Sequence, residues 1–126
     1  MPLTTAGQNL IAAAIVGTAY TAFNNANAAI GVGDSTSAFA QAQTDLQAST
    51  NTYRQAVDAT FPNITTNVLT FQVTFGTGVA NFAWNEWGVF NNTTGGTMLN
   101  RKQESLGTKQ NTQSWQFTCT LTVNAA

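Results

Sequence analysis

The chain has 126 residues but carries few charges, because four basic and five acidic side chains give a net charge of −1 and only 7% of the residues are charged. This length predicts one domain over residues 1–126. The only basic cluster is Arg101 with Lys102, which speaks against a nucleic acid partner. No apolar run approaches the about 20 residues of a membrane span, so we expect no membrane contact either.

The residue types that carry most enzyme chemistry are scarce. Histidine is missing, and with it the commonest general base, metal ligand and triad member. Cys119 is the only cysteine, and its place in an alternating segment favours a small buried hydrophobe over a metal ligand. Asp58 and Glu86 could form the carboxylate pair of a glycosidase, but nothing in the sequence places them together. We therefore expect no enzyme activity, no cofactor and no metal.

The first predicted element is a short amphipathic helix in TTAGQNLIAAAIVG, residues 4–17. Thr5 and Gln8 have the spacing of a capping box, and Gly17 suits the end of the helix. One stripe of this helix is apolar and consists of Leu10, Ile11, Ala14 and Ile15. Leu10 and Ile11 are therefore candidate interface residues for a neighbouring subunit.

The next part of the chain has a weaker pattern. Residues 19–34 predict two short extended segments that end in a glycine-rich turn. Residues 37–49 predict either one helical turn or a structured loop, held in place by Phe39 and Leu46.

From residue 53 onward the apolar residues alternate with polar ones, which is typical of half-buried strands. Residues 52–61 predict a strand that ends before Pro62, and two further strands follow in residues 67–76 and 114–123. We predict that these last two strands share one core, formed by Phe71, Val73, Phe75, Trp115, Phe117 and Leu121. The predicted fold is mainly β, an antiparallel β-sandwich or flattened barrel with a short N-terminal helix.

Residues 81–91 and 97–105 predict a hairpin, with Gly95 and Gly96 in the turn. If the turn spans residues 91–96, the numbers of residues that face each other across the hairpin add up to 187, and Glu86 lies opposite Arg101. A buried charge favours such a partner. We interpret Glu86 as half of an ion pair; a catalytic acid is the alternative. Its strand is apolar on both faces, so it lies either in the core or beneath another subunit. The structural or interface candidates of this hairpin are Trp84, Glu86, Trp87, Phe90 and Arg101.

Several motifs resemble small virion proteins of tailed bacteriophages. These motifs are a GVGDS turn, QTDL, a strand LTFQVTFG, an aromatic NEWGVFN and a return strand GGTMLNR. More distantly, LTTAGQNLIAAAIVG followed by a glycine-rich turn is similar to the N-terminal domains of phage tail-collar fibre proteins. The resemblance covers most of the chain and supplies no catalytic residues.

The resemblance implies a structural protein of the virion. Because the chain ends at Ala126 directly after a strand, with no shaft and no receptor-binding domain, we expect a capsid decoration (cement) protein that binds the major capsid protein. Its low charge and a strand that is apolar on both faces predict a homo-oligomer, specifically a trimer. The resemblance to virion proteins implies assembly in the host cytoplasm. The alternative is a fibre-type adaptor of the tail or collar, or a module that binds a host glycan through exposed tryptophans.

Overall fold

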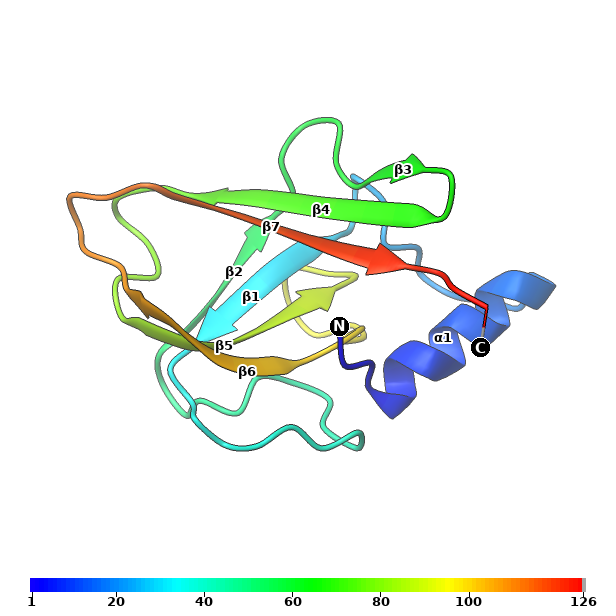
Figure 1. Cartoon of the computed structure of the whole chain (residues 1–126), viewed down its shortest axis with the longest axis horizontal. Coiled ribbons are helices and arrows are strands. Elements are labelled where there is room, and N and C mark those ends of the chain that lie inside the picture. Colours follow the sequence, from blue (N-terminus) through cyan, green and yellow to red (C-terminus); the bar gives the residue numbers. More distant parts are fainter. Residues whose placement is uncertain (126) are drawn as a thin grey trace.

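A computed structural model describes residues 1–125 and contains two antiparallel β-sheets that pack against each other, with one helix at one end (Figure 1). One sheet has the strand order β2-β1-β5-β6, and the other has the order β3-β4-β7. This architecture confirms the predicted fold class. The elements are α1 (Thr5–Val16), β1 (Ala29–Gly33), β2 (Thr52–Ala56), β3 (Asn63–Thr65), β4 (Val68–Phe75), β5 (Ala83–Phe90), β6 (Lys102–Thr108) and β7 (Trp115–Thr122).

The N-cap of α1 is Thr4, not Thr5 as the capping-box spacing suggested. Thr4 is buried, and its Oγ1 accepts a hydrogen bond from the backbone N–H of Gly7 at 2.9 Å. The same hydroxyl donates to the carbonyl of Met98 at 2.6 Å. The Thr4 hydroxyl thus provides a hydrogen bond to a free N–H at the helix N-terminus and another to the backbone of the neighbouring segment, which the exposed Thr5 cannot do. The helix ends where expected, at Gly17 in the left-handed conformation with φ 71°.

The predicted apolar stripe of α1 is only partly buried. Leu10, Ile11 and Ala14 are half-buried, whereas Ile15 is 80% exposed. Gly7 sets the close approach of the helix, since a Cβ at this position would clash with the carbonyl oxygen of Leu99. The N-terminal half of α1 is therefore anchored, and its last turn projects at the right-hand end of the molecule, beyond the ends of the strands (Figure 1).

Residues 19–34 contain one strand, β1, instead of the two predicted segments, and its glycines lie within the strand rather than in a turn. Both glycines make room for side chains of the neighbouring strand β5. A Cβ on Gly31 would lie 2.9 Å from the ring of Phe90, and one on Gly33 would clash with the Glu86 carboxylate. The segment that follows, residues 34–51, is a loop without regular secondary structure, and its Leu46 is buried.

The strand predicted for residues 52–61 is shorter than expected, because β2 ends at Ala56. The chain turns at Asp58, whose carboxylate accepts hydrogen bonds from the side chains of Gln72 and Thr74 in β4. The turn leads into β3, a three-residue strand that the sequence did not predict and that pairs with the start of β4.

Strands β4 and β7 pair along their whole length and share one core, as predicted. Phe71, Val73 and Phe75 are fully buried, and Trp115, Phe117 and Leu121 of β7 are half-buried and pack against them. The four-stranded sheet supplies the opposite wall of this core through Ile30, Val32, Trp84, Trp87 and Val89.

Strand β5 is covered on both faces within the single chain. A bulge between Trp84 and Glu86 interrupts the alternation, so Trp84 and Trp87 both face the core, whereas strict alternation would place them on opposite faces. Glu86 and Phe90 point to the other face, where the loop of residues 34–51 covers them. The first of the two sequence alternatives is therefore correct: the strand lies in the interior and needs no second subunit to cover it.

Candidate functional site

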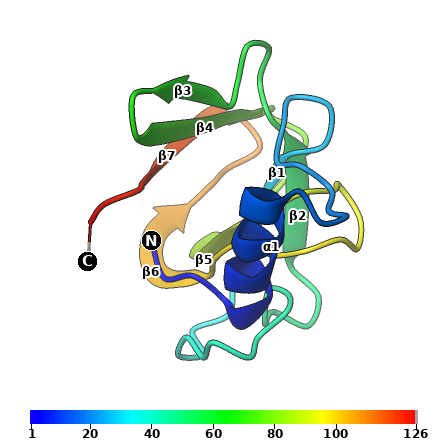
Figure 2. The same ribbon diagram turned by 90° about the vertical axis from the view of Figure 1, so that its right-hand side faces the viewer.

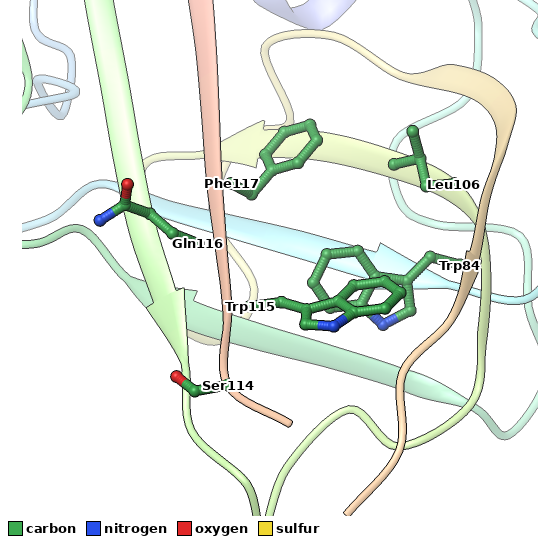
Figure 3. Close-up of a pocket in the computed structure, with 6 residues that line it drawn as sticks. All are labelled: Trp84, Leu106, Ser114, Trp115, Gln116 and Phe117. Carbon is green, nitrogen blue, oxygen red and sulfur yellow. The ribbon is translucent and has the colours of Figure 1, made fainter. Parts of the chain in front are cut away.

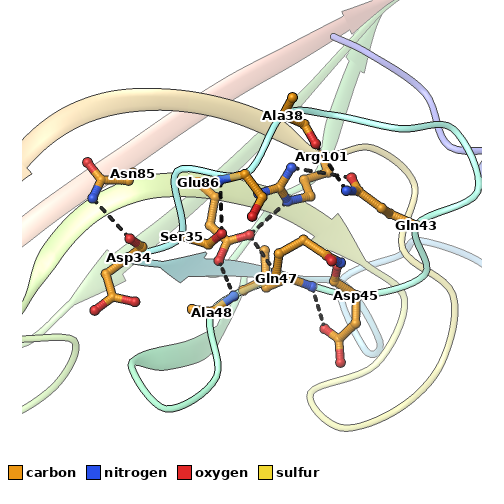
Figure 4. A network of polar contacts seen from close by, with 12 residues as sticks. Asp34, Ser35, Ala38, Gln43, Asp45, Gln47, Ala48, Asn85, Glu86 and Arg101 are labelled. Carbon is orange, nitrogen blue, oxygen red and sulfur yellow. Dashed lines mark hydrogen bonds and ion pairs between the residues drawn. The ribbon is translucent and has the colours of Figure 1, made fainter.

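The most polar buried site of the molecule is the predicted ion pair of Glu86 and Arg101 (Figure 4). Arg101 Nε lies 2.8 Å from Glu86 Oε1, and both side chains have no exposed surface. The carboxylate also accepts the backbone N–H groups of Gln47 at 2.7 Å and Ala48 at 2.8 Å. Arg101 Nη1 donates to Gln43 Oε1 at 3.3 Å. The pair therefore ties the loop of residues 34–51 to β5, and its carboxylate oxygens are engaged in hydrogen bonds rather than open to a substrate.

The register that suggested this pair is wrong, although the pair forms. Glu86 lies opposite Gln103, two residues further along than predicted, and Arg101 precedes the first residue of β6. The arm before β6, residues 97–101, does not follow the regular pairing pattern. The Asn100 side chain, in place of a backbone carbonyl, accepts the N–H of Val89, and the N–H of Arg101 donates to the carbonyl of Pro2. The long arginine side chain spans the offset.

The aromatic interface candidates of β5 are interior residues. Trp84, Trp87 and Phe90 are at most 5% exposed. The guanidinium of Arg54 lies 3.5 Å from the centre of the Phe90 ring and pairs with Asp45 at 3.3 Å, so the outer side of this ring is covered as well. These aromatic residues mainly hold the fold together, and only Trp84 reaches a surface groove, where it forms part of the wall.

A groove of mixed polar and apolar lining, which the sequence did not predict, opens between β6 and β7 (Figure 3). It has a volume of about 450 Å³ and is lined by Trp84, Leu106, Ser114, Trp115, Gln116 and Phe117. Trp115 packs edge-on against Trp84, with ring centres 4.9 Å apart, and keeps part of its own surface exposed. The groove exists because β6 and β7 do not pair, and strand pairing is a property of the topology that alternation within each strand cannot reveal.

A second groove, of about 460 Å³, lies between α1 and the turn after β5. Leu10 and Tyr20 line it on the helix side, and Asn91 and Thr97 line it on the turn side. Ile11 instead packs against the core. Of the two interface candidates predicted on the helix, Leu10 lines a surface groove and Ile11 does not.

The chemistry available at these sites is limited. Burial raises the pKa of the Cys119 thiol to about 12, so the thiol stays protonated and unreactive at neutral pH. Among residues 1–125, no cluster of three or more His, Cys, Asp or Glu side chains has the arrangement of a metal site. Over the same residues, no helix has the length and apolar character that a bilayer span requires.

Comparison with known families decides which kind of protein this is. Residues 1–123 match the family described as phage tail-collar fibre protein, N-terminal. The chain belongs to this family. The tail-collar fibre domain is thus a structural component of a bacteriophage virion, as the sequence motifs implied. No curated protein and no solved structure shows a significant match to the chain.

Proposed function

We propose that this tail-collar fibre domain is a non-enzymatic adaptor that attaches a fibre-type component to the tail or collar by binding another virion protein. The observation that carries this proposal is the family match over residues 1–123, which names the tail-collar fibre and its N-terminal part. Capsid decoration, the role first expected from the sequence, has less support than its tail or collar alternative.

The structure also weakens the physical argument for capsid decoration. That argument depended on a β5 strand too apolar for one chain to cover, and the chain covers both faces of β5 by itself. The remaining surface offers two open grooves instead, one beside β7 and one beside α1. Grooves of this kind suit attachment to a protein partner.

The non-enzymatic part of the proposal has support from the most buried acid. Glu86 is bonded through both oxygens to Arg101 and to the loop backbone, which leaves it without a proton-transfer role. Cys119 is protonated in the core. Binding by shape and hydrogen bonds is the activity that these residues leave available.

Self-association as a trimer, formed after synthesis in the host cytoplasm, is part of the same proposal. Ile15, Val16 and Ile64 are large apolar side chains that are more than two-thirds exposed. They lie in the last turn of α1 and in β3, which Figure 1 shows on the same side of the molecule. Low net charge opposes association of such surfaces only weakly. Light scattering coupled to size-exclusion chromatography measures the result, and a monomer at all concentrations would contradict the trimer.

Glycan binding, the other sequence alternative, has little support from the structure. Stacking of sugars needs exposed aromatic faces, and Trp84 and Trp87 are buried. Trp115 is the one tryptophan that is not fully buried, and it lines an open groove. We therefore place the adaptor role ahead of glycan recognition.

Cryo-electron microscopy of the intact phage particle tests the adaptor proposal. We expect density for this domain at the tail or collar, in contact with a second virion protein. Density that repeats over the capsid surface would contradict the adaptor role and restore the decoration role. As a control, particles of a mutant phage that lacks the gene should lose this density together with that of the fibre-type component it attaches.

A further inference from the structure

We propose that the free edge of β7, together with the groove beside it, is a docking site for an extended, uncharged peptide strand of a virion partner. The strand would add to the sheet next to β7 and give it the order β3-β4-β7-partner. The source of the strand rests on the proposed adaptor function, whereas the docking site itself follows from the geometry of β7.

The backbone of β7 has one unused side. Among the described residues its only sheet neighbour is β4, and β7 lies between β4 and β6, a strand that pairs with β5 but not with β7 (Figure 1, Figure 2). The N–H of Val123 donates to the carbonyl of Asn67 at 2.9 Å, so this facing pair is hydrogen-bonded. In an antiparallel ladder bonded and non-bonded pairs alternate. The residues of β7 that direct their N–H and C=O groups to the free edge are therefore Gln116, Thr118, Thr120 and Thr122.

The other sheet edges carry features that discourage strand addition, and β7 carries none. The edge strand β6 has Lys102 and Glu104 and pairs with β5 through a bulge, β3 has only three residues, and β2 carries Arg54. In contrast, β7 runs for eight residues without a charge, a proline or a bulge. It is the longest edge strand among the described residues and the least protected one.

The groove between β6 and β7 would take side chains of the added strand. An extended peptide on the β7 edge points every second side chain toward the core side of the sheet. At the start of β7 this side is the groove of about 450 Å³, whose walls include Leu106 and Trp115. None of its lining residues is charged. The complementary strand is therefore uncharged and has apolar residues at alternate positions.

A second copy of the chain fits this site less well than a partner strand does. If β7 of another copy paired with this edge, its Phe117 and Cys119 would still pack against their own core. Those side chains could not leave that core to fill the groove. The groove thus requires a segment whose apolar side chains are free, which a folded copy of β7 does not have.

The test uses overlapping peptides of about 12 residues, long enough for one strand, that tile the other virion proteins of the phage encoding the chain. Their affinities are measured for the whole chain and for two matched variants. Thr118→Pro removes an N–H that faces only the free edge, whereas Thr118→Ala keeps this N–H; both lose the hydroxyl that contacts Gln72. We expect an uncharged, alternating peptide to bind the unchanged chain and Thr118→Ala, and to bind Thr118→Pro at least about tenfold more weakly.

Thermal melting would reveal whether Thr118→Pro still folds, and a second variant tests the proposal if it does not. Leu106→Glu places a charge in the groove from β6 and leaves β7 unchanged, and it should weaken the same peptide by at least about tenfold as well. The Thr118 and Thr120 amides should become protected from hydrogen exchange in the complex. Absence of any binding peptide, equal affinity for all variants, or pairing of β7 with a second copy would each overturn the proposal.

The failure of this inference can be told apart from failure of the adaptor role in the particle density. A domain located at the tail or collar whose β7 edge is free retains the adaptor role and refutes strand docking. A domain located on the capsid whose β7 edge carries a partner strand refutes the adaptor role and supports strand docking.

Discussion

Both carboxylate oxygens of Glu86 accept hydrogen bonds, from Arg101 and from two consecutive backbone N–H groups of the loop that covers β5. The charged pair has no exposed surface, so its desolvation must be balanced by these bonds. Gly33 of the neighbouring strand leaves the space that the carboxylate occupies. One acid thus fixes the position of a long loop that contains no regular secondary structure.

The buried pair leads to a prediction about stability. Glu86→Gln leaves Arg101 buried without a counter-charge, and we expect the free energy of unfolding to fall by about 3–5 kcal/mol. The control is Glu104→Gln, which breaks the partly exposed pair with Lys102, 2.9 Å long, and keeps an amide oxygen that can accept the Trp87 indole N–H. This variant should cost at most about 1 kcal/mol. Urea unfolding monitored by tryptophan fluorescence measures both variants. Equal losses would show that Glu86 has no special role.

Cys119 predicts how stability changes in alkaline solution. The folded chain keeps the thiol protonated until a pKa of about 12, whereas the unfolded chain releases this proton near 9. Above pH 9 the unfolded state is therefore favoured increasingly, and the contribution of the thiol to stability falls as the pH rises toward 12. Unfolding measured at several pH values should show a steeper alkaline decline for the unchanged chain than for Cys119→Ala. Parallel curves would contradict the burial effect.

At the scale of elements, close backbone approaches decide where the helix and strands lie. Gly7 brings α1 against the carbonyl of Leu99, and Gly31 and Gly33 let β1 pass beneath the side chains of β5. The N-terminal segment then pairs with the irregular arm before β6, through the N–H groups of Thr4 and Arg101. The helix is therefore held at its N-terminal end, and its final turn stays exposed.

The position of the helix cap gives a prediction that separates two adjacent threonines. Thr4→Ala removes the bond from the Gly7 N–H and the bond to the Met98 carbonyl, and we expect a loss of about 1–2 kcal/mol in the free energy of unfolding. Thr5→Ala changes an exposed side chain and should stay within about 0.5 kcal/mol. Thermal melting of the two variants measures the difference, and a larger loss for Thr5→Ala would move the cap back to Thr5.

The whole molecule is most tightly packed around β1 and β5. All five residues of β1 are buried, and β5 is buried from Glu86 onward between β1 and β6. The seam between β6 and β7 is open on the other side of the core. The molecule therefore has a rigid centre and two accessible surfaces, the β7 edge and the last turn of α1.

This distribution predicts a pattern of hydrogen exchange. Amides of β1 and β5 should exchange slowest, at rates set by global unfolding, because their opening exposes the shared core. The final turn of α1, near Ile15 and Val16, should exchange much faster because few contacts hold it. Mass spectrometry of peptides from the two regions measures the contrast. Similar protection in both would mean that the helix end is held by contacts that the single chain does not show.

Alternation and composition by themselves determined much of this protein. The period of two in β4 and β7 identified both strands and their shared core, because one face of a half-buried strand must be apolar wherever its partner lies. Gly17 marked the end of α1 for an equally local reason, since only glycine adopts the left-handed conformation at little cost. The apolar surroundings of Glu86 predicted a buried counter-charge, and Arg101 supplies it although the register that selected this residue was wrong.

The tertiary structure decided the features that depend on which strands become neighbours. The bulge at β5 placed Trp84 and Trp87 on one face. The register by which Arg101 had been chosen already differs by one residue at the Phe90–Met98 bridge and by two at Glu86. The cap at Thr4 depends on the backbone carbonyl of Met98, far away in the chain. The groove and the free edge of β7 exist because β6 and β7 fail to pair. Local patterns fix what each segment prefers to bury, and only the assembled sheets fix what each segment leaves unpaired.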